Sequence, residues 1–96
     1  MRENRFVYRD RINQLGIAIA ALRKMRNLTQ EQLSEKAGIS RTFLSSIEAP
    51  GTTRSFSLEV LYAIADALEV KPGDILNFAD YPTFDLNLYF DYLILF

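Results

Sequence analysis

The stretch TQEQLSEKAGISRTFLSSIE, residues 29–48, decides the fold, because it contains two short amphipathic segments separated by a glycine. Thr29 and Gln32 have the spacing of a capping box, in which each side chain bonds the other's backbone amide. This pattern predicts a helix over residues 30–37. Gly38 ends that helix, since the left-handed backbone that closes a helix costs least at glycine.

A second helix begins almost at once. Ser40 is a preferred N-cap residue, and it predicts a helix over residues 41–48 with Leu44 and Ile47 on its apolar face. Two short helices joined by so tight a turn predict a helix-turn-helix. The outward face of the second helix is polar and small enough to enter the major groove of duplex DNA. This face carries Arg41, Thr42, Ser45 and Ser46.

Apolar residues at helical spacing continue on both sides of this unit. Upstream they predict a helix from Ile12 to Met25, with Ile12, Leu15, Ile19, Leu22 and Met25 on one stripe. Downstream, Ser57 caps a fourth helix, and Pro72 suits the first residue of a short fifth helix. The core-facing residues expected there are Leu58, Leu61, Ile64, Ala65, Leu68, Ile75 and Leu76. We therefore expect an all-α, five-helix domain over residues 12–77, preceded by an N-terminal arm over residues 1–11.

Composition excludes several classes of function. The 96 residues include no cysteine and no histidine, so they form no disulfide, no Cys/His zinc site and no Ser-His or Cys-His catalytic pair. The charged N-terminus lacks the apolar segment of a signal peptide, and the apolar run 15–22 is too short to span a membrane. We expect a cytoplasmic protein that is not an enzyme and uses no metal or cofactor.

The net charge of −1 hides an uneven distribution. Residues 1–54 contain ten Lys/Arg and five Asp/Glu, whereas residues 55–96 contain one lysine and seven acids. A basic half beside an acidic half is a hint of a polyanion-binding face, although charged residues are more often simply solvated.

Residues 29–48, with LGIAIAALRKMRNL at 15–28 and SLEVLYAIADALEV at 57–70, resemble the Cro and phage-repressor type of helix-turn-helix. The resemblance covers residues 12–77. It implies a lambda-repressor-like domain whose third helix reads the major groove while the second lies across the DNA backbone. It also implies a repressor-like transcriptional regulator that binds a palindromic operator as a homodimer, with no evident small-molecule effector.

Position by position, the resemblance assigns base reading to Arg41, Thr42, Ser45 and Ser46. Arg41 suits guanine O6 and N7, and the Thr42 methyl group suits a thymine. Contacts to the DNA backbone are assigned to Thr29, Gln30, Phe43, Thr52, Thr53 and Arg54. Gln30 is equally consistent with a helix former, and Phe43 with packing. Arg23 and Glu48 match the family's buried ion pair, which fixes how the third helix sits on the first.

The C-terminal segment, residues 78–96, differs from the rest and is not covered by the resemblance. Apolar residues alternate with polar ones, which predicts a strand, although a helical stripe also fits. The alternating residues are Phe84, Leu86, Leu88, Phe90 and Tyr92. A strand on a helical domain has unpaired backbone groups, so we expect this tail to pair with a second copy. Its alternatives are packing on its own helices and an edge for another protein.

A second class of function stays open alongside DNA binding. The chain would then be a protein-interaction module or antitoxin-like component on a helix-turn-helix scaffold, with the aromatic tail as its partner surface.

Overall fold

The computed structural model describes residues 8–51 and 54–80, and within them it contains five helices and no strand. The helices are α1 (Arg9–Met25), α2 (Gln30–Ala37), α3 (Arg41–Glu48), α4 (Leu58–Leu68) and α5 (Pro72–Ala79). The predicted all-α fold is confirmed. None of these helices is both long enough and apolar enough to cross a bilayer.

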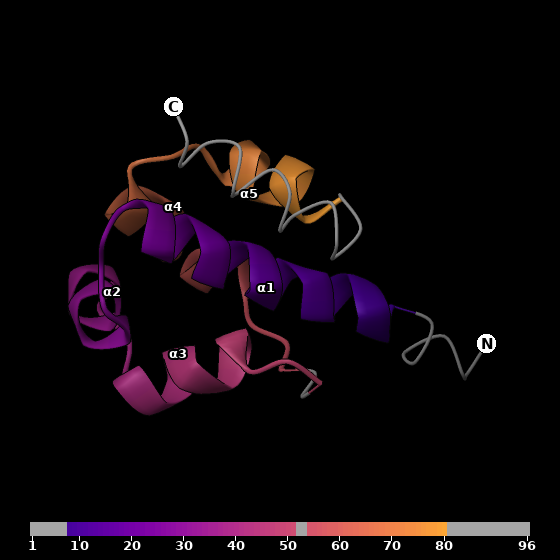
Figure 1. The fold of residues 1–96 in the computed structure, drawn as a ribbon, viewed down its shortest axis with the longest axis horizontal. Helices are drawn as coiled ribbons and strands as arrows, with labels where there is room; N and C mark the ends of the chain where they lie inside the picture. The colour runs from indigo at the N-terminus through magenta and orange to yellow at the C-terminus, as the bar shows by residue number, and fades with distance from the viewer. Residues whose placement is uncertain (1–7, 52–53, 81–96) are drawn as a thin grey trace.

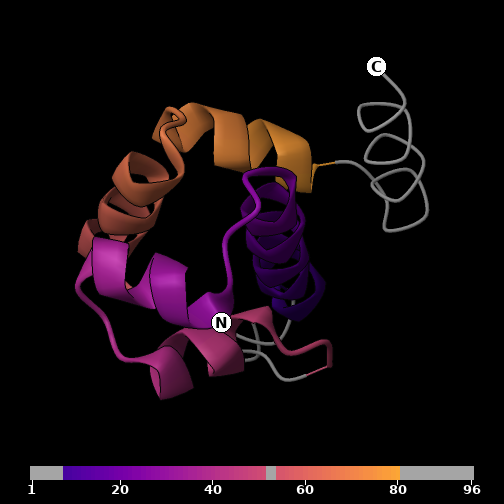
Figure 2. The ribbon, with the colours of Figure 1, turned by 60° about the vertical axis from the view of Figure 1, so that its left-hand side comes forward.

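The longest helix, α1, lies between α3 on one side and α5 on the other (Figures 1 and 2). Helix α2 packs against α3 and α4, and α4 packs against α5, so the five helices surround one core. The largest fully buried side chains come from every helix: Ile19, Leu33, Leu44, Ile64, Leu68 and Ile75. This arrangement leaves α3 at the edge of the domain, with one face that no other described helix covers.

The helix ends around the turn form as the sequence predicts. The Gln32 amide donates to Thr29 Oγ1 at 3.0 Å, and the Thr29 amide donates to Gln32 Oε1 at 2.9 Å, which completes the capping box. Gly38 closes α2 with φ 74°. Ser40 Oγ accepts from the Phe43 amide at 3.0 Å and begins α3. Thr29 and Gly38 therefore mark the two ends of α2, and Ser40 marks the start of α3.

Two helix boundaries lie beyond the predicted ones. Helix α1 begins at Arg9, three residues before Ile12. The sequence does not reveal this start, because Tyr8 makes no side-chain cap. Helix α5 continues to Ala79, where Phe78 and Ala79 pack against Ala18 of α1. Both residues therefore belong to the domain. The remaining tail residues, among them Phe84, Leu86, Leu88, Phe90 and Tyr92, lie outside the described ranges.

Two leucines that the periodicity assigned to the core lie on the surface, which corrects that expectation. Leu58 is 68% exposed and Leu76 is 47% exposed. Leu76 directly follows the fully buried Ile75, and Leu58 lies one turn before Leu61, which is 4% exposed. The stripe of apolar residues on each helix is therefore wider than the face that the core covers.

Candidate nucleic-acid interface

Helix α3 presents one polar face to solvent and buries the other. Leu44 is fully buried, and Ile47 and Glu48 are buried at its C-terminal end. Arg41 and Thr42, in its first turn, are exposed. Because its acidic residue, Glu48, is buried, the solvent face of α3 carries no carboxylate. This face is open to a polyanion.

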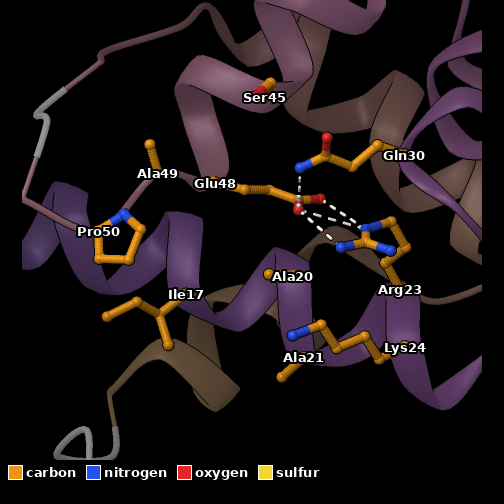
Figure 3. A pocket seen from close by; sticks show the side chains of 10 residues that line it. All are labelled: Ile17, Ala20, Ala21, Arg23, Lys24, Gln30, Ser45, Glu48, Ala49 and Pro50. Carbon is orange, nitrogen blue, oxygen red and sulfur yellow. Dashed lines mark hydrogen bonds and ion pairs between the residues drawn. The ribbon is translucent and has the colours of Figure 1, made fainter.

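The Glu48 carboxylate joins three helices. Arg23 Nε of α1 donates to Oε2 at 2.9 Å, and Arg23 Nη2 donates to Oε1 at 3.0 Å. Gln30 Nε2 of α2 donates to the same Oε1 at 3.0 Å, so Arg23 and Gln30 converge on the carboxylate (Figure 3). Arg23 Nη1 donates to the Leu28 carbonyl oxygen at 2.8 Å. These directional bonds fix the orientation of α3 on α1 and α2.

The backbones of α1 and α3 cross at Gly16. A Cβ atom built at this position would overlap the Ile47 carbonyl oxygen, with the Ile47 carbonyl carbon at 3.1 Å. Gly16 is fully surrounded, and no other residue type fits without moving one of the two helices. The distance of α3 from the long helix is therefore set at this crossing.

The loop after α3 contacts both α1 and α3. The Gly51 amide donates to Asn13 Oδ1 of α1 at 3.1 Å, which holds the turn where Gly51 adopts φ 83°. Farther along, the Arg54 guanidinium carbon lies 4.9 Å from the centroid of the Phe43 ring, within the range of a cation–π contact. This contact brings Arg54 beside α3. Thr52 and Thr53 lie outside the described residues.

Three of the predicted polar contacts already have partners inside the protein. One Gln30 N–H bonds Glu48, so the second hydrogen of that amide is the one left to donate. The Thr29 oxygen accepts from α2, which leaves its hydroxyl hydrogen as a donor. Ser46 Oγ donates to the Phe43 carbonyl oxygen at 2.7 Å, a bond back to its own helix. Arg41, Thr42 and Ser45 make no side-chain hydrogen bond to any residue of the described ranges.

A cavity of about 400 Å³ opens between α1 and the C-terminal half of α3. Small side chains of α1 make the room, and the Arg23–Glu48 pair is part of the lining (Figure 3). Its remaining lining residues are Ile17, Ala20, Ala21, Lys24, Gln30, Ser45, Ala49 and Pro50. Lys24 and Ser45 thus lie around one hollow beside α3. No group of acidic residues suited to a metal ion occurs within residues 8–51 and 54–80.

Charge is divided between the two sides of α1. Between residues 54 and 80, the exposed acids lie on or at the ends of α4 and α5: Glu59, Asp66, Glu69, Asp74 and Asp80. Helix α5 lies across α1 from α3 (Figure 1). The face that carries Arg41 is thus separated from the acidic side, which is the arrangement that attraction to DNA phosphates requires.

Pattern reasoning missed three residues that hold the interface in place. Gly16 interrupts the apolar stripe of α1, and a glycine inside a helix is the signal of a close approach. Asn13, which binds the loop, has no sequence signal. Arg26 donates to the Leu68 carbonyl oxygen at 2.9 Å and to the Glu69 carbonyl oxygen at 3.2 Å, so it caps α4. A long basic side chain next to a turn does not reveal such a distant partner.

A family model and individual relatives both match the helix-turn-helix part of the chain. A helix-turn-helix family model matches residues 19–75. The immunity repressor protein of Bacillus phage phi105 is 44% identical over 63 residues, which cover 66% of this chain and 42% of the repressor. Control protein C.BamHI of Bacillus amyloliquefaciens is 40% identical over 52 residues, 54% of this chain and 62% of that protein. The chain therefore spans less than two thirds of both relatives.

One solved structure has the same fold. The restriction-modification controller protein C.AhdI from Aeromonas hydrophila superposes with a TM-score of 0.62 at 26% identity. The match covers 67% of this chain and 94% of C.AhdI, so the similarity takes in nearly the whole of the controller protein.

Proposed function

The chain belongs to the helix-turn-helix family of the Cro and phage-repressor type, and on that premise we propose that it is a sequence-specific DNA-binding transcriptional regulator. Helix α3 enters the major groove. The observation that carries this proposal is the polar, carboxylate-free face of α3, held by a buried ion pair at its C-terminal end. An α-helix with its side chains is about 10–12 Å across, which fits the roughly 12 Å width of that groove.

Base reading is assigned to the exposed first turn of α3. Arg41 forks onto guanine O6 and N7, and the Thr42 methyl group contacts a thymine. Ser45 and Ser46 lie one turn later. The Ser46 hydroxyl hydrogen is engaged with the Phe43 carbonyl oxygen, which favours Ser45 as the hydroxyl donor toward DNA.

Phosphate contacts come from both sides of α3. On one side, the Thr29 hydroxyl, the second Gln30 amide hydrogen and the unpaired backbone amides at the start of α2 face an anion. On the other side, Arg54 lies over the Phe43 ring and supplies a guanidinium. Thr52 and Thr53 of the same loop complete the proposed set. Such contacts position the protein without reading sequence.

We further propose that a homodimer binds a palindromic operator. One domain makes few phosphate contacts, whereas two copies place their reading helices on half-sites about 34 Å apart. The tail, whose predicted strand carries Phe84, Leu86, Leu88, Phe90 and Tyr92, supplies the contact between copies by pairing its backbone edge with that of the second copy. Size-exclusion chromatography with light scattering on the full chain is expected to give twice the mass of 11.0 kDa. A monomer at micromolar concentration would contradict this dimer.

Selection of bound duplexes from a random pool, followed by gel shifts across salt, tests the function. We expect a palindromic site and a steep fall in affinity with salt. Arg41→Ala is expected to cost about 1–3 kcal/mol of binding and to relax preference at one position of each half-site. The matched control is Lys71→Ala, which removes the same charge on the far side of the domain and is expected to leave the selected site unchanged.

The opposite result is equally informative. A full-length chain that fails to bind any duplex at low salt would overturn DNA binding and favour the protein-interaction module. An Arg41→Ala variant with unaltered base preference would remove the assignment of that residue.

A further inference from the structure

Among the described residues, an apolar groove lies between α1, α5 and the start of α4. Two cavities of about 180 and 200 Å³ lie on either side of Leu15 and Leu76, which line both. The first cavity is also bounded by Ile12, Phe56 and Leu58, and the second by Arg11 and Ala79. Leu58 is 68% exposed there and Leu76 is 47% exposed. We call this surface the α1/α5 groove.

The groove ends at the point where the described chain ends. Ala79 and Asp80 line its second cavity, and Asp80 is the last described residue. Residues 81–96 therefore leave the domain at the groove itself. An exposed apolar surface of this kind marks a place where another element packs, and the next element of the chain starts beside it.

The composition of residues 81–96 matches that surface. Three quarters of the segment YPTFDLNLYFDYLILF is aliphatic, aromatic or proline, and it contains no basic residue. Read as a strand, it places Phe84, Leu86, Leu88, Phe90 and Tyr92 on one face. Its acids, Asp85 and Asp91, lie on the opposite face of such a strand, so they stay in solvent when the apolar face meets the groove.

We propose that residues 81–96 pack into the α1/α5 groove of their own chain, with the face of Phe84 to Tyr92 on Leu76 and Leu58. Pro82 stands at the reversal that this path requires, since the groove leads from Asp80 back along α5. Docking covers both exposed leucines and leaves the backbone edge of the strand free to pair with a second copy. The proposal does not depend on DNA binding.

A single tryptophan tests the docking, because the natural sequence has none. In the full-length Phe90→Trp variant, we expect an emission maximum typical of a buried indole and weak quenching by acrylamide. Adding Leu76→Glu is expected to lower the docked population at least about tenfold, since it removes the burial of a leucine side chain. Emission then shifts to longer wavelength while circular dichroism stays helical, because Leu76 is a surface residue.

The matched control is Tyr62→Glu. Tyr62 is an exposed apolar residue of α4 that lines neither cavity, so this substitution is expected to leave the emission of Phe90→Trp unchanged. Equal effects of the two substitutions would overturn the proposal. So would a tryptophan that is solvent-exposed from the start, or one that stays buried after Leu76→Glu.

Concentration distinguishes the chain's own groove from that of a second copy. Docking within one chain predicts the same emission at nanomolar and micromolar concentration, and loss of burial on dilution would overturn it. As the sequence also lacks cysteine, Leu76→Cys can be combined with Leu86→Cys or Leu88→Cys. Under oxidation, we expect at least one pair to form a cross-link that runs as a monomer on a denaturing gel and disappears on reduction. Cross-linked dimers alone would contradict the assignment.

Discussion

The two sides of α1 are held by different kinds of contact. Toward α3, a buried carboxylate accepts from two helices, and the Gly16 backbone lies directly against Ile47. Toward α5, the contacts are apolar, with Ala18 against Phe78 and Ala79. Hydrogen bonds and close backbone crossings specify one geometry, whereas apolar burial is nondirectional. The helix that reads DNA in our proposal is therefore attached by the more directional contacts, and the side with the exposed leucines by the less directional ones.

The largest expected effect on stability comes from removing one partner of the Arg23–Glu48 ion pair. Arg23→Met leaves Glu48 buried without its cation, and we expect a loss of about 3–5 kcal/mol in the free energy of unfolding, measured by urea denaturation. The double variant Arg23→Met/Glu48→Leu replaces the whole pair with apolar groups and is expected to recover most of that loss.

Measuring DNA affinity in these two variants shows whether the ion pair also orients α3, apart from its effect on the stability of the fold. The double variant is expected to fold but to bind the selected site more weakly, because Glu48 no longer joins α3 to α1 and α2. An Arg23→Met variant with an unchanged urea midpoint and unchanged DNA affinity would show that the pair has neither role.

A smaller loss is expected at the crossing of α1 and α3. Gly16→Ala puts a methyl group on the Ile47 carbonyl oxygen, so the helices must separate, at a cost of about 1–3 kcal/mol. Gly73→Ala in α5 is the matched control, because nothing lies within 4 Å of its added methyl group. There, we expect a gain of about 0.5–1 kcal/mol, the usual cost of a helical glycine. Equal effects in urea denaturation would contradict the close contact at Gly16.

Much of the fold follows from local signals in the sequence. Both ends of α2 and the start of α3 are encoded by Thr29, Gly38 and Ser40, whose side chains or backbone freedom act within a few residues. The start of α1 and the end of α5 have no comparable signal. Whether Phe78 belongs to a helix or to a tail depends on Ala18, sixty residues away. Only the folded chain brings the two together.

At the candidate site, the sequence predicted which side chains face outward better than it predicted the contacts between helices. The outward position of Arg41 and Thr42 follows from the helical period. The Arg23–Glu48 pair came from family resemblance, since no spacing rule links residues 25 apart. The sequence did not predict three contacts: the Gln30 bond to Glu48, the close approach of Gly16 to Ile47, and the Asn13 bond to Gly51. These contacts depend on how α1, α2 and α3 are placed relative to one another. Periodicity also failed at Leu58 and Leu76, as it cannot show where the core ends.

The smallest expected effect compares two residues with left-handed backbone that follow different helices. Asn27 (φ 60°) follows α1, and Glu69 (φ 62°) ends α4. Asparagine tolerates this conformation, whereas for other L-residues it costs about 1–2 kcal/mol. Glycine removes that strain but loses about 0.5–1 kcal/mol through its freer unfolded chain. We therefore expect Glu69→Gly to stabilise by about 0.5–1 kcal/mol and Asn27→Gly to give no gain.

Charge is the competing explanation at Glu69, because a carboxylate at a helix C-terminus is unfavourable in itself. Glu69→Ala distinguishes the effect of charge from that of backbone strain, since it removes the charge and keeps a Cβ atom in the left-handed region. Arg26 bonds the carbonyl oxygens of Leu68 and Glu69, so its cap survives both substitutions. In thermal denaturation, Glu69→Gly is expected to melt above Glu69→Ala. If both variants gain equally, the charge rather than the backbone limits the stability of α4, and the strain at Glu69 is not the cause.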